Sequence, residues 1–188
     1  MKSLPRTLNA KRQRGAALIV ALMILVIVSL LGISAMRASM FNAKISTSVQ
    51  AASLAFQGAE SAVSAAIEEA SSDPAGSNPD SLINDGIENF YVAGYTMYRC
   101  VTASAITAVD CSSSDRIDTR GVVQSRSKTV MSGTPRPIPG RSAGVQGSPG
   151  AGTQQSFLTF YTLGIGTVPD VSAGAYHIQQ FSTIGPSL

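Results

Sequence analysis

Two cysteines and one histidine are the side chains of this sequence with the clearest chemistry. Cys100 and Cys111 lie close together in the sequence, and two thiols in an oxidising compartment are expected to form a disulfide. The alternative is a metal site, which needs more ligands than these two cysteines and the distant His177 can supply. The spacing therefore predicts a disulfide and no metal site.

The remaining polar residues form no catalytic pattern. Gly164 and Gly166 are separated by one residue, but no helical pattern follows them, so they do not make a convincing phosphate-binding loop. No G-x-S-x-G, H-E-x-x-H or Walker pattern is present in the sequence. We interpret two acidic pairs as solvated charge: Glu68 with Glu69, and Asp115 with Asp118. We expect no catalytic residue, no cofactor and no enzymatic activity.

The charge of the chain is divided unevenly along its length. Of 188 residues, 44% are hydrophobic and only 13% are charged, so the apolar content must be concentrated somewhere. All 11 acidic residues lie at or beyond Glu60, together with only half of the 14 basic residues. The downstream body is therefore mildly acidic. A basic face for nucleic acid is not indicated, and we expect no direct nucleic-acid binding.

The apolar content is concentrated near the N-terminus. Residues 1–14 are rich in Lys and Arg, and residues 16–36 carry no charge. At about 1.5 Å per residue the uncharged run spans roughly 30 Å, the thickness of a hydrocarbon core. The charge asymmetry places residues 1–14 in the cytoplasm and the rest outside. A cleaved secretory signal is the alternative, but this run is too long for one and lacks an A-x-A-like end.

A long helix is the element that must carry this apolar run. No proline lies between Pro5 and Pro74, so a helix over residues 16–70 is uninterrupted. Beyond the apolar run, residues 37–70 show one apolar stripe at helical spacing: Ile45, Val49, Ala52, Phe56, Ala59, Val63, Ala66 and Ala70. We expect a sheet to cover this stripe. An isolated coiled coil is the alternative, although the repeat is short and mostly alanine.

Residues 71–188 form a body with the composition of a β structure. Four segments rich in Val, Thr, Tyr and Phe are predicted as strands: residues 88–102, 121–131, 156–168 and 175–184. Residues 133–152 are dense in Gly and Pro and are predicted as a long exposed loop, either without a role of its own or a contact surface. One helix covered by about four strands is an α+β arrangement.

Two segments of the helix resemble a known family. The run Arg12-Gln13-Arg14-Gly15-Ala16-Ala17-Leu18-Ile19-Val20 resembles the class III signal of type IV pilin precursors. With it, the later run LAFQGAESAV at residues 54–63 resembles the N-terminal signature of the PilX family of minor pilins. The resemblance covers residues 11–67. It implies a type IV pilin-like α+β fold, in which the outer half of a long N-terminal helix packs on a roughly four-stranded antiparallel head.

The resemblance also implies processing, partners and location. A prepilin peptidase would remove residues 1–15 as a basic leader by cutting after Gly15, and would methylate Ala16. Residues 16–36 would then serve for membrane anchoring and polymerisation, with the β-rich head in the periplasm. The expected partners are other minor pilins, the major pilin and the assembly platform in the inner membrane. The expected location is the inner membrane of a Gram-negative bacterium, then the extracellular pilus.

One departure from the pilin pattern concerns position within the filament. Most pilins carry Glu as the fifth residue after the cut, where this chain has Val20. In pilins that carboxylate is assigned to the N-terminal ammonium of the subunit added just before. A subunit without a predecessor needs no such carboxylate, so we expect a position at or near the filament tip.

The function expected from the sequence is that of a minor pilin that primes assembly of a type IV pilus and is incorporated into it, supporting biogenesis, adhesion and twitching motility. Two alternatives remain open. One is a K-type minor pseudopilin of a type II secretion system, which would share all of these features. The other is a periplasmic binding module on an uncleaved signal anchor.

Overall fold

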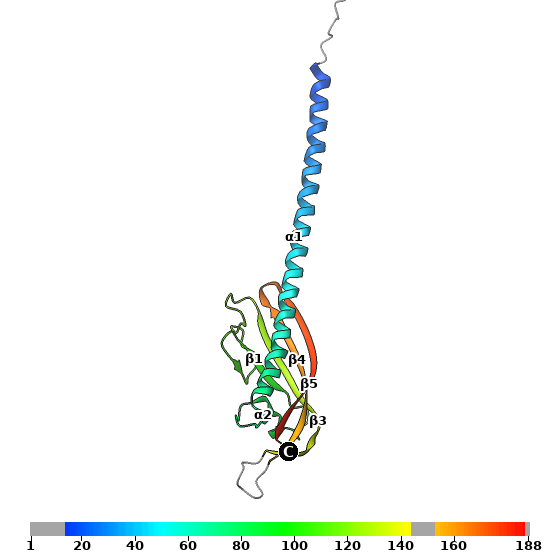
Figure 1. Cartoon of the computed structure of the whole chain (residues 1–188). Coiled ribbons are helices and arrows are strands. Elements are labelled where there is room, and N and C mark those ends of the chain that lie inside the picture. The colour runs from blue at the N-terminus through cyan, green and yellow to red at the C-terminus, as the bar shows by residue number, and fades with distance from the viewer. Residues whose placement is uncertain (1–13, 144–152, 187–188) are drawn as a thin grey trace, which may run out of the picture. The chain divides into compact units, whose positions relative to one another are not determined.

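The structure, a computed structural model, describes residues 14–143 and 153–186. It contains a long helix, a short helix and five strands (Figure 1). Their bounds are α1 Arg14–Ser72, α2 Leu82–Glu88, β1 Met97–Val101, β2 Ile106–Thr107, β3 Gln124–Ala143, β4 Thr153–Val168 and β5 Ala173–Pro186, with a 3-10 turn at Pro169–Val171. The chain divides into two compact units between Ser46 and Thr47, so each is described by itself.

The first unit is the N-terminal part of α1. Every residue from Ala16 to Ser46 is helical and exposed. Its leucines and alanines are good helix formers, and no proline interrupts them. Within the described residues, α1 is the helix that is long and apolar enough to cross a membrane, judged by length and composition. The expected long N-terminal helix is confirmed.

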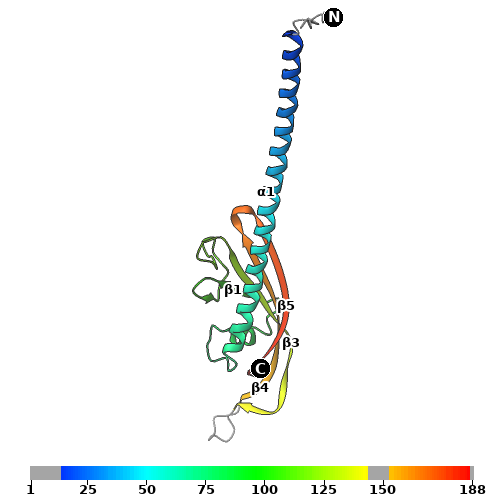
Figure 2. The same ribbon diagram turned by 45° about the horizontal axis from the view of Figure 1, so that its top comes forward.

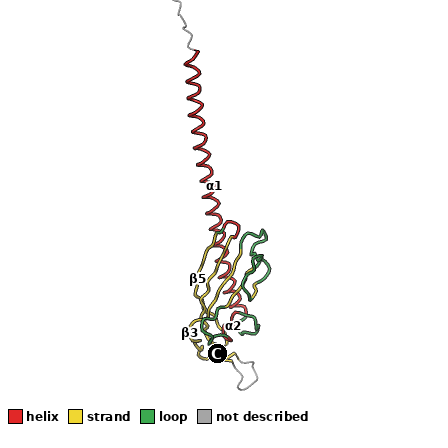
Figure 3. The backbone as a smooth tube through the Cα atoms, turned by 180° about the vertical axis from the view of Figure 1, so that it is seen from behind, coloured by secondary structure: helices red, strands yellow, loops and turns green. Residues whose placement is uncertain are grey.

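The second unit is an antiparallel sheet with the remainder of α1 on one face. The strand order is β2-β1-β3-β4-β5, and every neighbouring pair is antiparallel. Figure 2 shows the last turns of α1 lying across the sheet, in front of β3, β4 and β5, and Figure 3 shows the same packing from behind. The α+β class with a helix packed on an antiparallel sheet is therefore confirmed. The sheet has five strands rather than four because the two-residue β2 adds an edge.

The helix approaches the sheet closely at two glycines of β4. A Cβ atom added at Gly166 would overlap the carbonyl oxygen of Ala55, and one added at Gly164 would overlap that of Ala59. The Ser125 hydroxyl, on the neighbouring strand, donates a hydrogen bond of 2.6 Å to the Gly58 carbonyl. Backbone therefore rests on backbone here, and only residues without bulky side chains permit that contact.

A hydrophobic core fills the other end of the interface between helix and sheet. Its fully or almost fully buried members come from α1, α2, β1 and β4: Ala66, Ala70, Leu82, Ile83, Met97, Leu158 and Phe160. The ring of Phe160 stacks on Phe181 of β5 at 5.4 Å between centroids. Small helix residues thus face large sheet residues at this end, which keeps the interdigitated core dense.

The face that α1 buries differs in part from the predicted stripe. Ala59, Val63, Ala66 and Ala70 are buried as expected. The prediction is wrong for its first four members, Ile45, Val49, Ala52 and Phe56, which are all exposed. The buried positions nearest them are Ala51 and Ala55 instead. The cause is the close approach of β4, because the sheet selects the alanine side of the helix and leaves the bulkier side outside.

Helix and strand bounds also differ from those predicted. Helix α1 begins at Arg14 and ends at Ser72, slightly beyond the expected 16–70. The strand predicted at 88–102 is wrong at its start, since Glu88 ends α2 and β1 begins only at Met97. A buried helix of two turns has too short a periodic pattern to be distinguished from a strand by sequence.

The Gly- and Pro-rich segment is the other correction. Residues 133–143 belong to β3 rather than to a loop, and Gly133 has a positive φ of 75°. Strand β1 pairs with β3 only from Ser125 to Thr129, so beyond that point β3 is bonded on one side only. Proline is tolerated in such an edge region because no second ladder needs its N–H. The remainder of the predicted loop, residues 144–152, lies outside the described residues.

Candidate functional site

The predicted processing site lies at the start of α1. Gly15 and Ala16 are helical, whereas the predicted leader lies outside the described residues up to position 13. Val20 is 54% exposed. It follows Ala16 by four residues, which puts the two on the same side of the helix one turn apart. A side chain at position 20 therefore lies within one helical turn of Ala16.

Large aliphatic side chains cover this part of α1 on all sides. Those more than half exposed include Leu18, Ile19, Leu22, Met23, Ile24, Leu25, Ile27, Val28, Leu30 and Leu31. A helix that is apolar all round is stable only inside lipid or among other apolar helices. No described residue of the chain covers these side chains, so the segment is built to contact something else.

The second unit has a smaller apolar strip of its own on the exposed side of α1. It consists of Val49, Ala52 and Phe56, with Val49 62% and Phe56 48% exposed. The Phe56 ring meets the edge of the His177 ring at 6.1 Å. Glu60, one turn further, lies 2.9 Å from Nδ1 of His177. These contacts join the helix to the outermost strand, β5, and leave the apolar strip outside.

A buried arginine organises the end of α1. The Arg99 side chain is 2% exposed, and its Nε lies 2.9 Å from a carboxylate oxygen of Glu69. Its terminal nitrogens donate to Asp85 at 3.4 Å and to the Asp80 carbonyl at 3.2 Å. Glu69 also accepts a 2.9 Å bond from the backbone N–H of Leu82. The interpretation of Glu69 as solvated charge is therefore wrong: the carboxylate ties α1 to β1 and α2.

The carboxylates of the second acidic pair, Asp115 and Asp118, also accept hydrogen bonds from the backbone. Asp115 accepts a 2.7 Å bond from the backbone N–H of Ser112. Asp118 accepts bonds of 2.9 and 2.8 Å from the N–H groups of Val122 and Val123. Burial raises the pKa of Asp118, but the bonds from Val123 and Val122 outweigh it and hold that pKa below its ordinary value. Both carboxylates fix turns, which corrects their interpretation as solvated charge.

The predicted disulfide is confirmed. Cys100 and Cys111 are bonded, with their Cα atoms 4.9 Å apart. The bond fastens the segment after β2 to the buried strand β1. Asp115 brings an oxygen within 4.8 Å of both sulfur atoms. Since each sulfur is already in the covalent bond, neither is available there as a thiolate ligand.

Comparison with known families bears on the helix alone. Residues 14–64 match the family model described as PilX N-terminal. This N-terminal region belongs to the PilX family. The match lies within the segment that the sequence resemblance covered and does not extend to the strands. No curated protein and no solved structure matches the chain.

The PilX match of residues 14–64 bears on the role of the exposed helix. It implies the role of a minor pilin of a type IV pilus, which is structural rather than catalytic and requires partners in pilus assembly. The exposed apolar part of α1 is consistent with a pilin anchored in the inner membrane and later present in the pilus. The exposed apolar side chains of α1 are therefore the candidate functional surface.

Sequence reasoning missed two sets of residues that hold this surface in place. The Arg99–Glu69 pair left no signal, because the two residues are distant in sequence and charge alone does not identify partners. Gly164 and Gly166 did leave one, since glycines inside a strand pattern often mark a close backbone approach. Their spacing alone suggests at most a phosphate-binding loop, whereas in the structure they allow the close approach of the helix.

Proposed function

We propose that this chain is a minor pilin that is cut after Gly15, methylated on Ala16, and incorporated into a type IV pilus whose assembly it helps to start. The observation that carries the proposal is the wholly exposed apolar helix from Ala16 to Met36, in a region that matches the PilX N-terminal family. Its partners would be other minor pilins, the major pilin, the prepilin peptidase and the assembly platform of the inner membrane.

The proposed mechanism is packing of helices. In the membrane, lipid solvates the apolar segment as well as another helix does, so association depends on close packing and on partner geometry. Once a filament leaves the membrane, the same side chains must be covered by neighbouring subunits, since each Å² of apolar surface exposed to water costs about 25 cal/mol. The strip of Val49, Ala52 and Phe56 would extend this contact beyond the membrane.

The absence of a carboxylate at position 20 supports a place at or near the tip. In an apolar bundle, a charge without a partner costs several kcal/mol. In a subunit that packs against a preceding one, a carboxylate one turn from its own N-terminus can pair with the N-terminal ammonium of that preceding subunit. A first subunit has no predecessor to neutralise, and an apolar side chain such as Val20 then fits the bundle better.

The placement is tested with Val20→Glu in cells that lack the native chain. We expect Val20→Glu to leave the number of surface pili unchanged or lower it, because the carboxylate finds no ammonium to pair with. Val26→Glu is the matched control, since Val26 is about equally exposed at 50% but lies further from Ala16. Immunogold should label filament ends. A rise in piliation with Val20→Glu alone, or even labelling along the shaft, would show that the placement is wrong.

The same cells separate the proposed function from the alternatives. Deletion of the chain should reduce surface pili, twitching and pilus-mediated adhesion while leaving protein secretion intact. Loss of secretion with normal pili would instead identify a K-type pseudopilin. Normal pili, normal secretion and a chain that keeps residues 1–15 would identify an anchored periplasmic module.

A further inference from the structure

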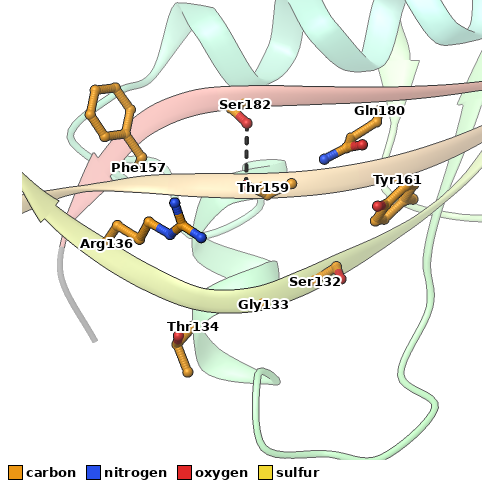
Figure 4. Close-up of a pocket in the computed structure, with 9 residues that line it drawn as sticks. All are labelled: Ser132, Gly133, Thr134, Arg136, Phe157, Thr159, Tyr161, Gln180 and Ser182. Carbon is orange, nitrogen blue, oxygen red and sulfur yellow. Dashed lines mark hydrogen bonds between the residues drawn. The ribbon is translucent and has the colours of Figure 1, made fainter.

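The face of the sheet that points away from α1 contains a hollow that pilus assembly does not explain. Figure 4 shows this hollow, with side chains from β3, β4 and β5 around it. Its volume is about 520 Å³, within the usual range for pockets that hold small ligands. The lining includes Arg136, Phe157, Thr159, Tyr161, Gln180 and Ser182.

The hollow has a structural cause in β3. Ser132 pairs with Thr159 and Arg136 pairs with Phe157, so β3 uses more residues than β4 to cover the same length. Gly133, inside this irregularity, has a positive φ of 75° that a side chain would strain. The extra residues bend β3 away from β4 and aim the guanidinium of Arg136 back toward β4 (Figure 4). Bulges of this kind commonly redirect a side chain at a binding site.

Two kinds of neutral group accompany the guanidinium. Phe157 and Tyr161 flank Thr159 on one face of β4 and are 46% and 41% exposed, so part of each ring is open to a ligand. The Thr159 and Ser182 hydroxyls bond to each other at 3.2 Å, and the Gln180 amide lies beside them. Aromatic surface next to hydroxyl and amide groups suits a ligand with an apolar ring face and many hydroxyls.

The charge of the lining indicates that the ligand also carries an anionic group. Strands β3, β4 and β5 contain no acidic residue. Within the described part of the chain, neither an ion pair nor a hydrogen bond is found for the Arg136 side chain, whereas Arg126 pairs with Asp110 and Lys128 lies over the Tyr98 ring. Among the side chains that the structure describes on this face, Arg136 is thus the basic group that remains open to an anion, and guanidinium binds carboxylates and sulfates in a two-pronged manner.

We propose that this hollow binds an acidic saccharide. A sugar ring packs on Phe157 and Tyr161, its hydroxyls bond to Gln180 and the neighbouring hydroxyls, and its carboxylate or sulfate pairs with Arg136. A single-stranded nucleic acid fits less well, because such strands follow a groove with several positive charges rather than one. The proposal does not depend on incorporation into a pilus, so the two can fail separately.

The test uses the full chain in lipid nanodiscs and three matched probes: 3′-sialyllactose, 3′-sulfolactose and lactose. Saturation-transfer NMR titrations give their affinities. We expect the two acidic probes to bind at least about tenfold more tightly than lactose, and the stronger of the two identifies the acidic group as carboxylate or sulfate. Equal binding of all three probes, no binding of any, or tighter binding of an oligothymidine of similar charge would overturn the proposal.

Substitutions then locate the site. Arg136→Gln should weaken binding of the acidic probes about tenfold and leave lactose unchanged, whereas Lys128→Gln on the same face should change neither. Tyr161→Ala should weaken all three probes, and Tyr176→Ala is its control because Tyr176 is 69% exposed outside the hollow. Unchanged thermal unfolding confirms that each variant is folded. Equal effects of Arg136→Gln and Lys128→Gln would show that only general charge is involved.

Discussion

Helix α1 uses its two parts in opposite ways. From Ala16 to Ser46 all side chains are exposed, and up to Met36 most of them are large and aliphatic. From Thr47 to Ser72 its buried side chains are mostly alanine, and they lie against glycines of β4 at one end and against large core residues such as Leu158 and Phe160 at the other. One part has its partners inside the chain, while the other requires lipid or neighbouring subunits. Substitutions should therefore affect the stability of the second unit or assembly, but not both equally.

The largest expected effect on stability is at Arg99. Arg99→Met leaves the carboxylates of Glu69 and Asp85 without their cation in a largely buried place, which should lower the free energy of unfolding by about 4 kcal/mol. Chemical denaturation of the full chain in detergent measures this. Arg120→Met, at an exposed position, is the control and should change little. Equal small effects would mean that the buried pairs do not hold the end of α1.

The disulfide should rank second. Its reduction, or the double substitution Cys100→Ser with Cys111→Ser, frees the segment after β2 and should lower the free energy of unfolding by about 3 kcal/mol. The measurement is thermal unfolding with and without reductant. The double variant serves as the control, because reductant should no longer shift its midpoint. If reductant did not shift the thermal unfolding midpoint of the wild-type chain, the disulfide would not contribute the expected stability.

The close contact between helix and sheet should rank third. Gly166→Ala places a Cβ where the Ala55 carbonyl lies, so the helix must move and the free energy of unfolding should fall by about 2 kcal/mol. Gly174→Ala is the matched control, because the nearest atoms to its added Cβ are 3.9 Å away. Similar midpoints for the two variants would show that the helix is not held at backbone distance.

The features of the structure differ in how far the sequence predicts them. The disulfide was predictable because only two cysteines exist, and the helix because apolar spacing continues without proline. The face of α1 that is buried is not predictable in this way. Periodicity favours the bulky side with Phe56, but it does not show which side chains fit against the sheet. The Arg99 pairs and the hollow by Arg136 arise from segments distant in sequence, and local patterns carry no information about such meetings.

A smaller effect is expected from acid. Hydrogen bonds from the backbone N–H groups of Asn78 and then Ser77 hold the pKa of Asp73 below its ordinary value of 3.8. A lowered folded pKa contributes stability above the ordinary value, and that stability is lost as the pH falls through the folded pKa. Asp73→Asn should thus narrow the gap in melting temperature between pH 7 and pH 3. Asp170→Asn, at an exposed turn, should leave that gap as in the wild type.

The smallest effect on stability is expected in the first unit. Leu25 is 64% exposed, so Leu25→Ala should leave the free energy of unfolding of the second unit unchanged within about 0.5 kcal/mol. The same substitution should reduce the amount of chain recovered in sheared filaments, because its partner surface is lost. Gly166→Ala should do the opposite: it should lower the free energy of unfolding of the second unit and leave recovery in filaments unchanged. If Leu25→Ala lowered stability and spared incorporation, the contrast between the two parts of α1 would be wrong.

The most direct test of the account is the N-terminus of the mature chain. Intact-mass and N-terminal peptide analysis should be made on the protein from native membranes and from sheared surface filaments. The account predicts a chain that starts at N-methylated Ala16 and is present at trace level in the filaments. A chain that still starts at Met1 and is confined to the membrane would contradict it, and would leave an anchored periplasmic domain.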